Sequence, residues 1–285
     1  MKKKVWILAA ALFCLLLGWE LYRSNRVLTV EHEQISTELV TGKVRIVHLS
    51  DLHNAQFGEN NEELLAAVSA QTPDLIFFTG DLITGSRKET DVAMNLVERL
   101  VKIAPVYVSL GNHELRHEKN FGSDLTGMLE YRGAKLLEYD YEDVTVQGQQ
   151  LRIGGISACC VPEIYLWTGE AKPWECDYLK TFQNTSRCTL LLAHIPVAWI
   201  QNGGLDYWDV DLVFSGHTHG GQFRVPLIGG IYGPDVGLFP GWLEGRISSA
   251  DGRKSMILSR GLGNSFPVPR LNNPPQVLVV DIVPK

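Results

Sequence analysis

The chain has 285 residues, of which 45% are hydrophobic and 20% are charged, and it has no internal repeat or low-complexity segment. These values are typical of a globular protein with a full apolar core and exclude a disordered or fibrous chain. The net charge is −6, but residues 1–26 carry five basic residues and one acid, so the remaining body has 21 basic and 31 acidic residues, or −10. An acidic body of this kind is not expected to bind nucleic acid.

The N-terminal segment has the pattern of a membrane signal. Lys2, Lys3 and Lys4 precede an unbroken apolar run over residues 5–19, and the next residues offer no small-x-small cleavage site. The run spans about 22 Å as a helix, and extending it to Tyr22 makes it long enough to cross a bilayer. We therefore expect residues 1–26 to form an uncleaved single-pass signal anchor in the cell membrane. A buried helix fits less well, because the run is apolar on every face.

The positive-inside rule weighs the three lysines and the N-terminal amine before the run against the two arginines after it. This comparison predicts a cytoplasmic N-terminus and an extracytoplasmic body. Residues 27–42 read as a polar linker, so residues 43–285 are expected to form the folded domain.

The first half of the domain alternates apolar runs with helical patterns. Strands are predicted at 44–49, 75–78 and 106–110, and helices at 62–70 and 89–102. Asn60 and Glu63 suggest a capping box for the first of these helices. The alternation is typical of a βαβ layer with buried parallel strands.

Further strands are predicted in the second half, where residues 143–156 resemble a hairpin around Gly148. The remaining strands are expected at 190–193, 210–214, 254–258 and 277–282. The hairpin implies that antiparallel pairs are mixed into this sheet, and the fold class is α/β.

Polar clusters follow five of the predicted strands. They are Asp51-Leu52-His53, Gly80-Asp81, Gly111-Asn112-His113-Glu114, Ala193-His194 and Gly216-His217-Thr218-His219. Binding sites in open α/β sheets assemble outside the carboxyl ends of the strands, which is where these residues fall. A lone Asp-x-His or Gly-Asp is usually a turn, and a lone histidine is usually structural. Five clusters in this order, each after an apolar strand, predict a metal site.

The residue types also indicate a chemistry. Carboxylate, amide oxygen and imidazole suit divalent or trivalent ions such as Mn, Fe or Zn, and no thiolate is needed. A carboxylate such as Asp81 can bridge two ions, with Asn112 completing the second site without added charge. Two ions about 4 Å apart can share a hydroxide and hold a phosphoryl group for in-line attack.

With these motifs in this order, the domain resembles the calcineurin-like metallophosphoesterase superfamily, from about residue 43 to residue 282. It is most similar to the bacterial YkuE-like branch, which is often membrane-tethered or exported. Stretches that support the branch are Gly220-Gly221-Gln222, Ser259-Arg260-Gly261-Leu262-Gly263, Arg270 and Asn272-Asn273-Pro274-Pro275. The resemblance implies a four-layer αββα sandwich of two mixed sheets. Asn54 departs from many relatives, which leaves substrate contacts there open.

The resemblance also implies roles for the motif residues. One metal would be held by Asp51, His53, Asp81 and His219, and the second by Asp81, Asn112, His194 and His217. His113 would stabilise the transition state or protonate the leaving oxygen and would not bind metal. Arg260 and Arg270 are weaker candidates for phosphate contacts.

Three functions follow from these features. The leading hypothesis is a two-metal phosphoesterase, and the branch favours a diester substrate. The alternative is a pyrophosphatase that cleaves a nucleotide-diphospho-lipid, of the UDP-diacylglucosamine type, at the membrane face. It is suggested by the anchor and by the apolar loop residues Trp167, Trp174, Leu238, Phe239 and Trp242, which also suit a core. The third is a scaffold that kept the fold and lost catalysis, which is disfavoured because every ligand is present.

The sequence leaves other properties open. Of five cysteines, Cys14 lies in the apolar run, and Cys159, Cys160, Cys176 and Cys188 form no CxxC pair. A structural zinc knuckle is therefore not expected, while disulfides in an exported body stay possible. Oligomeric state and the physiological substrate are not indicated.

Overall fold

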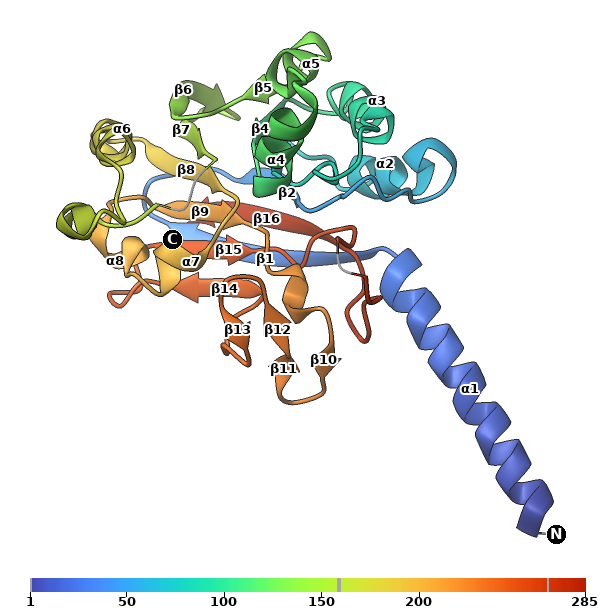
Figure 1. The fold of residues 1–285 in the computed structure, drawn as a ribbon. Helices are drawn as coiled ribbons and strands as arrows, with labels where there is room; N and C mark the ends of the chain where they lie inside the picture. Colours follow the sequence, from blue (N-terminus) through green and yellow to red (C-terminus); the bar gives the residue numbers. More distant parts are fainter. Residues whose placement is uncertain (1, 158–159, 266) are drawn as a thin grey trace.

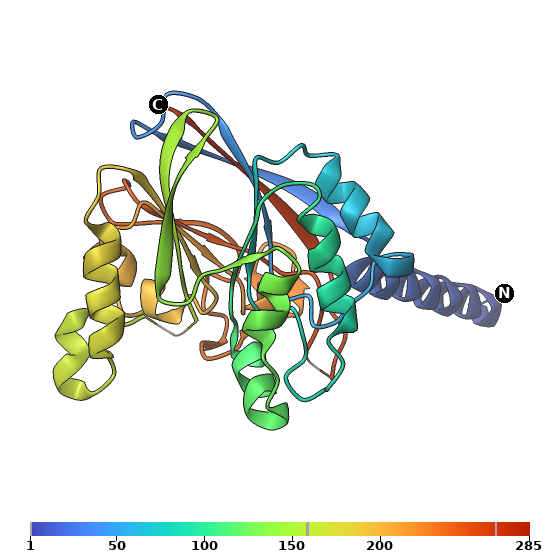
Figure 2. The same ribbon diagram turned by 90° about the horizontal axis from the view of Figure 1, so that it is seen from above.

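Two six-stranded sheets pack face to face in the computed structural model, which describes residues 2–157, 160–265 and 267–285 (Figure 1). Helices cover the outer face of each sheet, as the view from above in Figure 2 shows. The predicted four-layer αββα arrangement is therefore confirmed. Both sheets mix parallel and antiparallel neighbours, also as predicted.

The first sheet contains the parallel strands of the βαβ layer. In spatial order it consists of β1 (Thr29–Thr37), β16 (Gln276–Pro284), β2 (Val44–Leu49), β3 (Leu75–Thr79), β4 (Val106–Ser109) and β5 (Lys135–Leu136). Strands β2, β3, β4 and β5 are parallel, and β16 runs antiparallel to β2.

The second sheet contains the hairpin predicted around Gly148. In spatial order it consists of β14 (Gly245–Ser248), β15 (Ser255–Leu258), β9 (Leu212–Ser215), β8 (Cys188–Ala193), β7 (Gln149–Ile156) and β6 (Asp140–Val146). Strands β15, β9, β8 and β7 are parallel, and the edge strands β14 and β6 are antiparallel to their neighbours.

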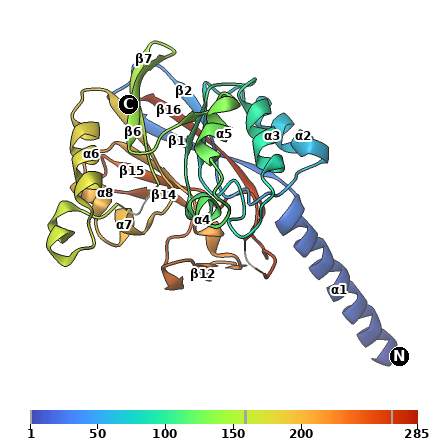
Figure 3. The same ribbon diagram turned by 45° about the horizontal axis from the view of Figure 1, so that its top comes forward.

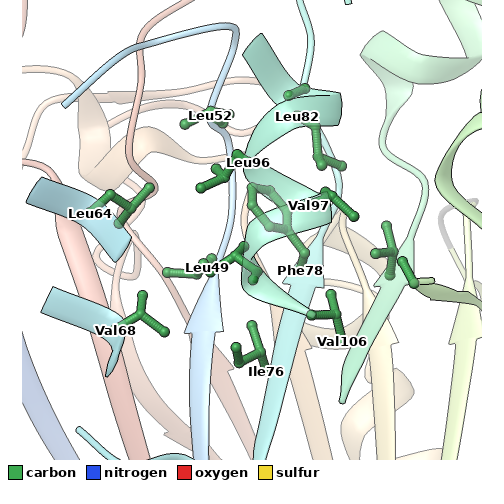
Figure 4. Close-up of a cluster of buried hydrophobic side chains, with 14 of the residues drawn as sticks. Leu49, Leu52, Leu64, Val68, Ile76, Phe78, Leu82, Leu96, Val97 and Val106 are labelled. Carbon is green, nitrogen blue, oxygen red and sulfur yellow. The ribbon is translucent and has the colours of Figure 1, made fainter. Parts of the chain in front are cut away.

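Three apolar clusters fill the spaces between the four layers. On the first sheet lie α2 (Glu62–Ser69), α3 (Asp91–Leu100) and α5 (Leu125–Tyr131); on the second lie α6 (Pro173–Gln183), α7 (Val197–Ile200) and α8 (Gly204–Tyr207). Figure 4 shows Leu64 and Leu96 from the helices packed against Leu49 and Phe78 of the first sheet. The central cluster joins the sheets, for example through Phe77 and Phe214, whose rings meet edge to face at 5.0 Å. Each strand of this interior buries both faces, which is why it reads as a continuous apolar run.

Short elements complete the chain. They are α4 (Asn112–Phe121), the 3-10 helices η1 (Glu59–Asn61), η2 (Glu163–Thr168) and η3 (His219–Gly221), and two small hairpins, β10 (Arg224–Val225) with β11 (Gly229–Gly230) and β12 (Tyr232–Gly233) with β13 (Gly237–Leu238). The two hairpins project below the sheets in Figure 1, and the tilted view in Figure 3 shows them at the lower edge of the body.

The linker predicted at residues 27–42 is wrong. Residues 29–37 form β1, which pairs in parallel with the whole of β16 and forms the edge of the first sheet. Its burial alternates and only Ile35 is fully buried, so an edge strand with a polar outer face resembled a linker. The folded domain therefore begins before residue 43.

The N-terminal helix α1 (Lys2–Arg26) has the predicted bounds and projects from the body (Figure 1). It is long and apolar enough to cross a membrane. Its most apolar 18-residue segment has a mean hydropathy of 2.0, and none of that segment is buried against the body. Signal sequences share these properties. Its last turns contact the body, because Ser24 accepts a hydrogen bond from the backbone of Asn273, and Glu20 accepts one from the backbone of Asn272.

The capping box predicted for α2 is also wrong. Asn60 and Asn61 both adopt left-handed backbone conformations, and no side chain caps the helix. The Asn61 side chain instead accepts a hydrogen bond from the backbone of Phe57, which closes the preceding loop.

Candidate metal centre

The polar motifs meet where five parallel strands end. Strands β2, β3 and β4 of the first sheet and β8 and β9 of the second all stop one to three residues before a predicted ligand. Because both sheets contribute, the residues converge at one end of the sandwich, from segments up to 168 residues apart. The gathered side chains are Asp51, His53, Asp81, Asn112, His113, His194, His217 and His219.

The backbone at the centre is unusual for non-glycine residues. Five of the seven predicted ligands have left-handed conformations, with φ between 48° and 71°: Asp51, His53, Asp81, His217 and His219. Such conformations cost about 1–3 kcal/mol each and persist only where the surroundings enforce them, which is typical of functional sites.

Asp81 lies at the centre of the cluster. Its Oδ2 is 3.5 Å from Nε2 of His53 and 3.2 Å from Nε2 of His194, and Nε2 of His113 lies 4.0 Å away. Although burial opposes ionisation, the neighbouring His194 holds the pKa of Asp81 well below its usual range. Asp81 therefore offers a charged oxygen to both sides of the cluster.

Two sets of ligand atoms flank Asp81. On one side, Asp51, His53 and His219 offer atoms that all lie within 4.8 Å of one another. On the other, His194 and His217 form such a set with Asp81 itself. A third set of the same kind consists of His53, Asp81 and His113, so the division of ligands between two ions stays a prediction.

The donor atoms fit metal ions. Nε2 of His53, Nε2 of His194 and Oδ1 of Asn112 are buried and have no hydrogen-bond partner among the described residues. Unsatisfied buried polar atoms are costly, and their convergence beside a carboxylate is the arrangement expected of ligands for a cation. The set contains nitrogen and oxygen donors only, which suits Mn, Fe or Zn.

Backbone carbonyls orient two of the imidazoles. Nδ1 of His194 lies 2.6 Å from the carbonyl of Thr79, and Nδ1 of His53 lies 3.3 Å from the carbonyl of Ile83. Because a carbonyl can only accept, each Nδ1 carries a hydrogen, so Nε2 is the nitrogen through which each neutral ring can offer a lone pair to the cluster.

Asp235 orients a third imidazole and is a residue that sequence reasoning missed. Its Oδ2 accepts a hydrogen bond of 2.8 Å from Nε2 of His217, which leaves Nδ1 of that ring for the cluster. The hydrogen bond from His217 also lowers the pKa of Asp235. Asp235 lies in the loop between β12 and β13, where no strand end or motif marks it.

Glu114, the last residue of its motif, holds two of the loops together. Its carboxylate accepts hydrogen bonds from the backbone N–H groups of Asp81 (2.7 Å), Gly111 (2.8 Å) and Ile83 (3.2 Å). Burial, followed by the charge of Asp81, raises the pKa of Glu114 to about 7. Glu114 thus fixes the ligand-bearing turns after β3 and β4 relative to each other.

Two motif glycines are required by close packing. A Cβ at Gly111 would overlap Oδ1 of Asp81, and a Cβ at Gly216 would overlap the side chains of Ser50 and Asp51. Any larger residue at either position would displace a ligand carboxylate.

His113 lies beside the ligand set, with its side chain 13% exposed. The backbone N–H of Gly85 donates to its Nδ1 at 3.0 Å, so in the neutral ring the hydrogen is on Nε2, the atom nearest Asp81. Burial lowers the pKa of His113 to about 4, so the ring is neutral near pH 7 and presents an N–H donor to the centre.

The two candidate arginines have different environments. Arg260 is engaged by Glu31 and Glu244, so its guanidinium is committed to ion pairs. Arg270 is 1% exposed, and its Nη2 lies 3.3 Å from Nδ1 of His219. Of the two, only Arg270 reaches the centre.

Two cavities flank the cluster. One of about 400 Å³ is lined by Asp81, Asn112, His113, Arg116, Ile195, His217, His219, Pro234 and Asp235. The other, of about 560 Å³, includes His53 and Arg270 and extends to the end of α1. The centre is therefore reached from both sides.

The other three histidines lie outside the cluster, as expected. His48 is buried in β2 with its Nε2 2.8 Å from the hydroxyl of Thr79, and His117 contacts Ser123. His32 is exposed on β1.

Residues 44–221 match the family model described as calcineurin-like phosphoesterase, which is more than half of the chain. The phosphodiesterase YaeI of Escherichia coli is 28% identical over 246 residues, covering 84% of this chain and 82% of the relative. The uncharacterised metallophosphoesterase YkoQ of Bacillus subtilis is 29% identical, over 72% of this chain and 74% of the relative. An uncharacterised metallophosphoesterase of Campylobacter jejuni, Cj0846, is 27% identical over 91% of this chain, which spans 65% of that relative's length.

Among solved structures, a dimetal phosphatase from Danio rerio aligns with a TM-score of 0.42 and 14% identity, over 76% of this chain and 87% of that one. A 5'-nucleotidase precursor from Thermus thermophilus aligns with a TM-score of 0.48 and 14% identity, over 77% of this chain and 49% of that one.

The family model covers all the polar motifs that form the centre. The chain belongs to the calcineurin-like phosphoesterase family.

Proposed function

We propose that this chain is a metal-dependent phosphodiesterase that works with two metal ions. The observation that carries the proposal is the convergence of three buried, unpartnered donor atoms, from His53, His194 and Asn112, on the shared carboxylate of Asp81. The name of the E. coli relative, a phosphodiesterase, supports a diester substrate. The oxygen and nitrogen donors suit Mn, Fe or Zn alike.

The proposed ligand sets share one residue. Asp51, His53 and His219 would hold the first ion, Asn112, His194 and His217 would hold the second, and Asp81 would be shared by the two sets. Two ions bound in this way supply an acidified water as nucleophile and neutralise the charge of the phosphoryl group.

His113 acts on the substrate and binds no metal. Its neutral ring carries the hydrogen on Nε2, held there by the N–H of Gly85 on the opposite nitrogen. From this position the ring can donate a hydrogen bond to a phosphoryl oxygen or pass a proton to the leaving oxygen. An N–H donor aimed at developing charge stabilises the transition state more than the ground state.

Separate measurement of metal content and turnover tests these roles. Asp81→Asn should lose bound metal and hydrolysis of a chromogenic diester together, because both sites share this carboxylate. His113→Ala should retain metal and lose turnover by about 10²–10⁴-fold, the usual contribution of a general acid.

His32→Ala is the matched control, since it removes an exposed imidazole far from the motifs and should change neither quantity. If His113→Ala empties the site, the separation of ligand from catalyst is wrong. If the purified wild-type chain binds less than one metal per molecule and manganese does not stimulate diester hydrolysis, the non-catalytic scaffold is the better description.

A second candidate, a pyrophosphatase for a nucleotide-diphospho-lipid, is favoured by exposed apolar side chains. Leu238 is 68% exposed and Phe239 is 56% exposed, in the hairpin beside Asp235, so they are not core residues. Trp167 and Trp174 are exposed too, at 85% and 58%, while Trp242 is partly buried. Apolar loops near a catalytic centre and an apolar anchor would suit a lipid-linked substrate.

A substrate panel separates the two enzymes. Detergent-solubilised protein that releases nucleotide monophosphate from a nucleotide-diphospho-lipid, yet does not cleave soluble diesters, would identify the pyrophosphatase. Cleavage of soluble diesters without action on the lipid would identify the phosphodiesterase.

The proposed location is the cell membrane, with α1 as a retained single-pass anchor and the body outside the cytoplasm. The contacts of Ser24 and Asn25 with the body support retention of the helix, because cleavage after Asn25 would remove this ordered interface. In intact spheroplasts, added protease should remove a tag at Lys285 and spare a tag before Lys2. The reverse pattern would place the body in the cytoplasm.

A further inference from the structure

A second cavity adjoins the centre on the side of His53, and its chemistry differs from that of the metal cluster. It has a volume of about 560 Å³, within the range of small-molecule sites. His53, Leu262 and Gly263 form its inner part, and Asn25 and Arg26 at the end of α1 form its rim. The cavity therefore extends from the metal centre to the point where α1 leaves the body.

Arg270 lines this cavity with a buried, incompletely bonded guanidinium. Its Nε and Nη2 donate to backbone carbonyls, at 2.9 Å and 2.6 Å to Gly263 and at 2.8 Å from Nη2 to Arg260. Its Nη1 has no hydrogen-bond partner among the described residues, although the residue is 1% exposed.

The charge of Arg270 also has no dedicated partner. All of its described hydrogen-bond partners are neutral: the two carbonyls and Nδ1 of His219. Asp51 attracts this guanidinium, but Asp51 is proposed to bind metal. A buried cation is costly unless an anion meets it, so the free Nη1 indicates a missing anionic partner in the cavity.

Two more arginines add to the positive charge at the mouth. Arg26 and Arg87 are exposed, line the same cavity, and form no ion pair with another residue that the structure describes. The described lining contains no carboxylate, although the body as a whole is acidic. Guanidinium groups bind phosphate through paired N–H donors, which makes such a cluster suited to a phosphate group.

We propose that this cavity is an anion subsite, and that the substrate is a phosphodiester carrying a second phosphate on the arm that points toward α1. The inference rests on the proposed diester hydrolysis and adds the substrate class to it. The scissile phosphoryl lies at the metal cluster, and the second phosphate meets Nη1 of Arg270, with Arg26 and Arg87 at the mouth. The second phosphate belongs either to a soluble molecule or to a lipid headgroup beside the anchor.

The test compares binding of ethyl phosphate with binding of ethane-1,2-diol bisphosphate, using the metal-loaded full chain in neutral detergent and isothermal titration calorimetry. Wild type should bind the bisphosphate about tenfold more tightly, since each rim charge contributes modestly and the buried guanidinium adds more. Arg26→Gln combined with Arg87→Gln should reduce this preference about threefold and leave ethyl phosphate unchanged. Both residues are exposed, so folding should be retained.

Lys88→Gln is the matched control, because it removes the same charge one residue from Arg87 and does not line the cavity. Equal affinity of wild type for the two phosphates would refute the subsite. So would a preference that stays near tenfold after the double substitution, or one that falls equally in the lysine variant. Hydrolysis of ethyl p-nitrophenyl phosphate is measured in parallel. If that is absent while the binding preference holds, the diesterase proposal fails and the subsite stands.

Proteoliposomes distinguish the two sources of phosphate. If phosphatidic acid in place of phosphatidylcholine competitively weakens binding of the soluble bisphosphate, a lipid headgroup occupies the subsite. If lipid composition has no effect on that affinity, the subsite takes a soluble phosphate.

Discussion

Glu114 should support the metal centre without binding metal, and Glu114→Gln tests this. The carboxylate accepts three backbone N–H groups: those of Asp81 (2.7 Å) and Ile83 (3.2 Å) after β3, and that of Gly111 (2.8 Å), the N-cap of its own helix after β4. An amide can place its oxygen toward the Asp81 and Gly111 donors, but its NH₂ then faces the N–H of Ile83. Two charge-assisted bonds become neutral, and one buried donor is left unsatisfied.

Loss of charge assistance and one unsatisfied donor cost about 1–3 kcal/mol each. Burial and the charge of Asp81, which raise the pKa of Glu114 to about 7, already disfavour the carboxylate, so their relief offsets most of this cost and leaves a net of about 1 kcal/mol or less near pH 8. For a domain of this size the melting temperature should change by no more than about 3 °C, measured by calorimetry on metal-free protein. Affinity for manganese should fall about 10–100-fold, as for other groups that orient ligands. Glu118→Gln, one turn later in α4, loses only one acceptor of 3.2 Å and is the control. A Glu114→Gln protein with wild-type metal affinity would refute the reasoning.

Three further predictions concern other groups. Asp235→Asn should weaken binding of one manganese about tenfold, because it removes the acceptor that orients His217; titration showing two unchanged sites would contradict this. Gly111→Ala should yield protein without bound metal, because the new Cβ overlaps Asp81, and wild-type metal content would exclude that overlap. Burial raises the pKa of Glu175 from 4.5 to about 7. Between pH 4.5 and 7 the folded state therefore binds more protons than the unfolded state, and the free energy of unfolding falls as the pH rises through this range. After allowance for partial solvent access, Glu175→Gln should be more stable than wild type by about 1–2 kcal/mol at pH 8 and equal near pH 4, by denaturant titration.

The sandwich could be predicted from sequence because its interior strands bury both faces. Val44–Leu49 has the predicted bounds, and the other interior strands deviate by a few residues at their ends. The eight candidate site residues all lie in one place because each follows such a strand, and parallel strands of both sheets end on the same side.

The features that could not be predicted from the sequence depend on tertiary contacts. Strand β1 shows one buried position, Ile35, and only its pairing with β16 identifies it as part of the sheet. Asp235 is recognised only through the ring of His217, 18 residues away. From sequence Arg260 is a weak candidate for a phosphate contact, and its ion pair with Glu31, 229 residues away, is visible only in the structure.

The last turn of α1 is hydrogen-bonded to the segment that supports the centre. Asn25 and Ser24 bond to residues 270 and 273, while Asn273 in turn donates to the carbonyl of His219. No flexible spacer separates the helix from the body, because β1 begins three residues after α1 ends. A helix held in a bilayer would therefore set both the height and the tilt of the catalytic opening above the lipid surface. Inserting a few flexible residues after Arg26 would free that geometry while leaving every catalytic side chain intact.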